Sequence, residues 1–183
     1  VRPDLDDKVV VGWNGLVISA LSKAASALKA LRPEQSSKYK GVAESAAVFI
    51  REKLWDDNEK VLYRIWSGGR GNVAFADDYA YLAQGLLDLF ELTENQAYLE
   101  FADILQRKLS LPPCLRAISL TVVETQISLF YDADGAFFTT QVNSPHTILR
   151  LKDGMDTSLP STNAVSVSNL FRLADLLSDE DLA

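Results

Sequence analysis

The feature that most constrains the fold of this chain is a sequence pattern that occurs twice, at residues 54–63 and 129–138. In both copies an apolar stretch ends on a leucine and an aromatic residue, an acidic turn follows, and an aromatic, strand-like run comes next. Each copy leads through a polar loop into a new apolar helix. Helical hairpins that recur in this way cannot bury both faces alone, so they stack into an open solenoid or a closed ring. The strand-like loops favour the ring.

Apolar residues spaced three and four apart predict five helices, which pair into hairpins where the links between them are short. Asn14 is the expected N-cap of the first helix, and Pro33 marks the boundary between the first two. Runs of β-branched and aromatic residues predict short strands in the loops. The helices are expected at about residues 14–32, 77–93, 96–109 and 160–177, with a further helix that follows Pro33 at once and carries its apolar stripe over 39–54. The strands are expected at 61–66 and 136–140.

The length of the chain limits how much of a ring it can form. A helical hairpin with its loop takes on the order of 50 residues, so a closed ring of six hairpins needs roughly twice the present length. Only three inner helices are expected within the 183 residues. Residues 1–183 are therefore predicted to be a fragment of a single α/α-toroid domain, with the remaining hairpins absent.

Composition excludes several classes of partner and site. The 18 basic and 25 acidic residues give a net charge of −7, which repels nucleic acid and anionic membrane surfaces. The apolar run Ala46–Ile50 is far shorter than the roughly 20 residues of a membrane span, and Val1–Asp7 has no signal-peptide character. One cysteine, Cys114, and one histidine, His146, cannot build a disulfide or a zinc site. No metal or cofactor is expected.

Four motifs carry a resemblance to a known family: KVVVGWNGL at Lys8–Leu16, FADDYAYL at Phe75–Leu82, RLKDG at Arg150–Gly154 and PSTN at Pro160–Asn163. They resemble the carboxy-terminal part of the spermatogenesis-associated protein 20 family, which is also described as thioredoxin-like domain-containing proteins. The resemblance implies a mainly α fold, a partial (α/α)6 toroid of helical hairpins with short β-ribbon loops. The resemblance also implies a six-hairpin glycosidase-like fold. In whole family members this region follows a thioredoxin-like domain, which is absent here.

The chain departs from this family at two places. Thr162 stands where the family usually has glycine, which is expected to change how closely a ligand approaches the helix start. Residues 110–123 are longer and less amphipathic than the family's outer helix, as an inserted stretch would be. Sugar epimerases of this toroid class rely on a pair of histidines, so His146 alone speaks against epimerase chemistry.

Asp77 and Asp78 are the candidate catalytic residues. Two carboxylates with different pKa values are what glycosidic cleavage or proton abstraction requires. Adjacent residues diverge by about 100° on a helix, however, so the two side chains need not face one pocket. The alternative is that they stabilise the helix N-terminus by capping and by charge.

The candidate substrate-binding residues lie beside the starts of the first, third and fifth predicted helices. Aromatic rings suit stacking on a sugar, although core packing is an equal alternative. The amides can either cap a helix or bind a ligand, and the charged loop residues can either neutralise an anionic substrate or form local ion pairs. These candidates are the aromatic Trp13 and Tyr79, the amides Asn14 and Asn163, the loop residues Lys152, Asp153 and Asp156, and Ser161.

Three hypotheses for function follow. A carbohydrate-active toroid predicts that Asp77 or Asp78 lies beside Trp13 and Tyr79 in one cavity, with a saccharide as ligand. A non-catalytic ligand-binding or scaffolding module would serve the absent redox domain. A truncated fragment without independent activity would expose apolar edges that the missing part of its own polypeptide normally covers.

Overall fold

The computed structural model describes residues 3, 5–107, 129–142, 144 and 147–177. Five helices account for most of this part of the chain. None of the described helices is long and apolar enough to cross a membrane. The helices are α1 (Val11–Leu28), α2 (Pro33–Lys53), α3 (Ala76–Thr93), α4 (Gln96–Arg107) and α5 (Thr162–Leu177).

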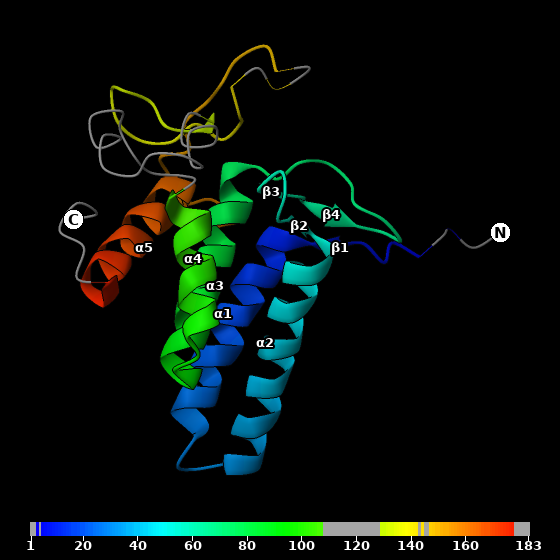
Figure 1. The fold of residues 1–183 in the computed structure, drawn as a ribbon, viewed down its shortest axis with the longest axis vertical. Coiled ribbons are helices and arrows are strands. Elements are labelled where there is room, and N and C mark those ends of the chain that lie inside the picture. The colour runs from blue at the N-terminus through cyan, green and yellow to red at the C-terminus, as the bar shows by residue number, and fades with distance from the viewer. Residues whose placement is uncertain (1–2, 4, 108–128, 143, 145–146, 178–183) are drawn as a thin grey trace.

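The helices form two antiparallel hairpins and one further helix, arranged as the sequence predicts. α1 packs against α2 and α3, while α3 packs against α4 and α5. The inner helices α1, α3 and α5 start at the end of the molecule that carries the strands, and the outer helices α2 and α4 return toward that end (Figure 1). The predicted helical-hairpin architecture is therefore confirmed.

Glycines bring α1 and α3 unusually close together. A Cβ atom at Gly15 would lie 2.6 Å from the backbone of Tyr81 and Leu82, and one at Gly85 would lie 2.5 Å from the carbonyl oxygen of Gly15. No side chain fits between backbones at that distance. Gly12 and Gly15, both in the KVVVGWNGL motif, are thus packing residues on the α3 side of α1.

Short strands hold the loops at the helix starts. β1 (Val9–Val10) pairs antiparallel with β4 (Ile65–Trp66), and β2 (Trp55–Asp56) pairs antiparallel with β3 (Val61–Leu62). The strand predicted at 61–66 is confirmed as two short pieces. The strand predicted at 136–140 is wrong, because Ala136 has a φ of 67° and the segment makes only isolated bridges.

One predicted helix start also needs correction. α1 begins at Val11, directly after β1, with Val10 at the N-cap position. Asn14 is already inside the first turn, where its side-chain amide donates to the carbonyl of Val10 at 2.8 Å. α2 begins at Pro33 itself, a residue suited to the first helical turn because that N–H needs no partner. The predictions for residues 110–123, Cys114 and His146 lie outside the described residues.

Candidate functional site

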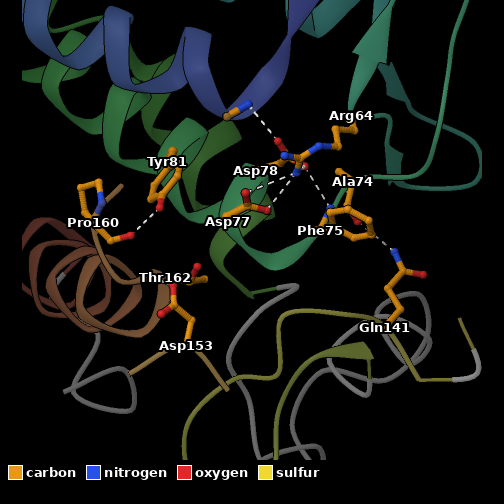
Figure 2. Close-up of polar contacts among 11 residues, drawn as sticks. Arg64, Ala74, Phe75, Asp77, Asp78, Tyr81, Gln141, Asp153, Pro160 and Thr162 are labelled. Atoms are coloured by element: carbon orange, nitrogen blue, oxygen red, sulfur yellow. Dashed lines mark hydrogen bonds and ion pairs between the residues drawn. The ribbon is translucent and has the colours of Figure 1, made fainter. Parts of the chain in front are cut away.

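The starts of all three inner helices are joined at one end of the molecule. The backbone N–H of Gly12, in the first turn of α1, donates to Oδ1 of Asp78 on α3 at 2.9 Å. The hydroxyl of Tyr81, one turn into α3, donates to the carbonyl of Pro160, which lies just before α5. Figure 2 shows Tyr81 and Pro160 on one side of Asp77 and Arg64 on the other. The convergence that the hairpin pattern predicts is present in the structure.

Asp78 holds this junction together. Its carboxylate is fully buried and accepts hydrogen bonds from Gly12 N, from Phe75 N at 3.0 Å and from Arg64 Nη1 at 2.6 Å. The bond from Phe75, the N-cap residue of α3, satisfies a backbone donor at the helix start. Burial first, and then the like charge of Asp77, raise the pKa of Asp78 to about 6, against the opposing effect of Arg64 and the two N–H groups. Asp78 is therefore a structural carboxylate that no ligand can reach.

Asp77 is the accessible member of the acidic pair. Its side chain is 25% exposed, and both of its oxygens accept from Arg64 Nη1, at 3.1 and 3.3 Å. The Arg64 guanidinium also lies over the ring of Phe75, 5.0 Å from its centroid. Burial alone would lower the pKa of Arg64, but the charges of Asp78 and Asp77 raise it above its usual value. One cation thus pairs with two carboxylates, and Asp77 stays open on one side.

The predicted pairing of Trp13 with Tyr79 in one cavity is wrong. Tyr79 is buried in the core, where its hydroxyl accepts from Leu62 N at 3.1 Å and its ring packs against Phe130. Burial raises the pKa of this phenol to about 12. Trp13 is instead 57% exposed on α1. Of these two rings, Trp13 is therefore the one that a ligand could stack on.

Two residues of this junction were not among the predicted site residues. Arg64 lies in the strand-like run and has no motif to mark it. Tyr81 follows Asp77 by four residues, a spacing that places both on the same face of α3. Burial, followed by the charges of Asp77 and Asp153, raises the pKa of Tyr81 to about 12. The spacing from Asp77 was the signal that could have identified Tyr81.

The loop before α5 forms an extended cap. The carbonyl of Asp153 accepts from Ser161 Oγ at 3.0 Å, and the carboxylate of Asp156 accepts from Ser161 N at 2.8 Å. Oδ2 of Asp153 faces the N–H of Thr162 at 3.4 Å, and Ser161 Oγ accepts from the N–H of Ala164 at the same distance. Asp153 and Asp156 thus place negative charge at the positive end of α5.

The remaining candidates make structural contacts. Asn163 accepts from Phe137 N at 2.7 Å and donates to Phe137 O and to the carbonyl of Asp153, so its amide ties two loops together. It does not cap its own helix. Lys152 pairs with Asp132 at 2.6 Å, which is the local ion-pair alternative. Within the part of the chain that the structure describes, no cluster of histidine, cysteine and carboxylate side chains could hold a metal ion.

Comparison with known proteins confirms the family resemblance. No family model matches the chain. Spermatogenesis-associated protein 20 of mouse is 31% identical over 98% of the chain, and that of human is 29% identical over the same share. The chain spans about a fifth of the length of these relatives, 21% in both cases.

Solved structures with a similar backbone confirm the fold class. Cellobiose 2-epimerase from Spirochaeta thermophila matches with a TM-score of 0.66 and 13% identity, over 98% of this chain and 41% of that one. The cellobiose 2-epimerase from Bacillus thermoamylovorans matches with a TM-score of 0.59 and 17% identity, over 99% of this chain and 43% of that one. The chain is thus mainly α and has the fold of part of an (α/α)6 toroid. At these identities the likeness concerns the fold alone.

Proposed function

We propose that this chain supplies a saccharide-binding surface of the six-hairpin glycosidase-like domain, because 98% of the chain aligns with spermatogenesis-associated protein 20. One observation carries the proposal. The starts of α1, α3 and α5 meet near Asp77, which stays partly exposed while Arg64, Asp78 and Tyr81 are held by hydrogen bonds. Rigid polar groups of this kind orient a ligand without a cost in ordering the site.

The chemistry of the exposed groups suits sugar hydroxyls. Asp77 offers carboxylate oxygens as acceptors for sugar hydroxyls, and Arg64 offsets part of the negative charge of the acidic pair. Trp13, one residue after Gly12, presents an exposed ring that can cover an apolar sugar face. Similar folds occur in enzymes named for cellobiose and mannose, which supports a saccharide as the ligand class.

The same geometry favours binding over hydrolysis. Cleavage by two carboxylates needs both groups within reach of the scissile bond. Asp78 is fully buried and accepts three hydrogen bonds, so the predicted catalytic pair is reduced to Asp77. We therefore propose a ligand-binding role for these residues.

We further propose that the chain forms one part of a ring completed by other hairpins of the same polypeptide. The curated relatives are about five times longer, and the apolar side chains of Val167 and Phe171 on α5 are 48% and 58% exposed. Helix faces of this kind are normally covered by a neighbouring hairpin in a toroid. The same proposal includes a thioredoxin-like domain in that polypeptide, as the family resemblance implies.

The test is a saccharide titration of the 183-residue chain followed by amide NMR, with cellobiose and mannose in the panel. We expect shifts centred on Gly12 and Asp77. Asp77→Asn should weaken binding at least tenfold, since a hydrogen bond to a charged group contributes about 1.5–3 kcal/mol. Asp175→Asn, a change at an exposed aspartate on α5, is the matched control and should have no effect. Equal binding by Asp77→Asn and wild type would exclude the proposed site.

A further inference from the structure

A pocket lies between α1 and α3, in the C-terminal halves of both helices and away from their starts. It has a volume of about 280 Å³, near the lower end of the roughly 300–1,000 Å³ of pockets for small molecules. Ser22, Lys23 and Ser26 line it from α1, and Asp88 and Glu91 line it from α3. A ligand of this pocket must therefore be small.

A buried hydroxyl in this pocket has no partner. Ser22 is 1% exposed, and its Oγ makes no hydrogen bond. A buried hydroxyl left in this way costs about 1–3 kcal/mol of desolvation, which a ligand hydroxyl would recover if the Ser22 side chain turned toward the pocket. Ser22 can both donate and accept, so it fits a ligand group that does the same.

The charges around the pocket cancel. Asp88 is buried and accepts from Lys23 Nζ at 3.1 Å, from Arg172 Nη2 at 2.8 Å and from the hydroxyl of Ser19. Arg172 also pairs with Glu91 at 2.7 Å. Two cations and two carboxylates leave no net charge to attract an ion, and a charged ligand would have to disrupt one of these pairs. An uncharged ligand is therefore favoured.

We propose that this pocket binds a small uncharged molecule rich in hydroxyl groups, a polyol or a monosaccharide. Ser22 and Ser26 bond its hydroxyls, and the aliphatic side chains of Ala27 and Leu92, which also line the pocket, contact its C–H groups. The proposal does not depend on the surface around Asp77, because the two places share no residue.

The experiment is an amide NMR titration of the chain with D-glucose, compared with gluconate and glucosamine as anionic and cationic probes. We expect saturable shifts at Ser22, Ser26 and Leu92, with both charged probes binding more weakly. Ser22→Ala should weaken D-glucose binding about two- to tenfold, the effect of one neutral hydrogen bond. Since it removes an unpaired hydroxyl, it should leave the melting temperature unchanged or slightly raised.

Two further variants make the result decisive. Ala27→Trp fills the pocket from an exposed position on α1 and should abolish the shifts. Ser45→Ala, at an exposed serine on α2, is the control and should bind like wild type. Shifts confined to Gly12 and Asp77 would support the proposed function and overturn this second site. Undiminished binding by Ser22→Ala or Ala27→Trp would overturn it as well.

Discussion

Replacing Gly15 by alanine should separate the two central helices. The added Cβ would lie 2.6 Å from the backbone nitrogen of Leu82 and from the carbonyl group of Tyr81, and backbone atoms in a helix cannot rotate away. Overpacking of this kind costs about 1–3 kcal/mol, and the contact with three backbone atoms argues for about 3. Alanine regains about 1 kcal/mol of helix propensity. We therefore expect a net loss of about 2 kcal/mol in the free energy of unfolding.

Urea and thermal unfolding followed by circular dichroism measure this loss. For a chain of this size, about 2 kcal/mol corresponds to a melting temperature lower by roughly 4–8 °C. Gly41→Ala is the matched control, because a Cβ at this position of α2 meets nothing within 4 Å and should stabilise the protein by up to about 1 kcal/mol. The close packing of α1 on α3 would be refuted if Gly15→Ala were as stable as Gly41→Ala.

Three other changes test the junction at the helix starts. Tyr79→Phe should cost about 1–3 kcal/mol of unfolding free energy, because the buried N–H of Leu62 loses its acceptor; no loss in urea unfolding would contradict that role. The pKa of Asp78 is higher in the folded than in the unfolded state, so the folded state binds its proton more tightly. Protonation therefore stabilises the folded state at low pH, and this stabilisation is lost as the pH rises from about 4 through 6. The free energy of unfolding of wild type, minus that of Asp78→Asn, should fall by up to about 3 kcal/mol over this range, and a flat difference would argue against it. Asn163→Ala should expose the N–H of Phe137 to hydrogen exchange, whereas unchanged protection would mean that the amide does not bridge the loops.

The helices could be predicted from the sequence because each buries a stripe that repeats at helical spacing. The start of α1 could not, since the helix begins where β1 ends, and β1 exists only through its pairing with β4, some 55 residues further along the chain. Asn14 looks like an N-cap in sequence, but that pairing moves the helix start to Val11. Helix content depends on local patterns, and helix ends here depend on distant partners.

The location of the candidate site could be predicted from the sequence, but the role of each residue in it could not. Asp77 and Asp78 are adjacent and identical in sequence, yet one is open and the other is buried beneath Gly12, 66 residues away. The same holds for Tyr79 and Tyr81, of which one fills the core and the other reaches the loop before α5. Arg64 could not be identified at all, because its role depends on where the β-ribbon loop lies against α3. Such distinctions require the tertiary packing.

A single buried carboxylate, that of Asp78, joins the starts of α1 and α3. Amide NMR between pH 4 and 8 tests it directly, because the N–H groups of Gly12 and Phe75 both donate to Asp78. Both resonances should titrate with one shared midpoint near pH 6, and neither should titrate in Asp78→Asn. Separate midpoints, or a titration seen at Phe75 but not at Gly12, would contradict the convergence of the inner helices.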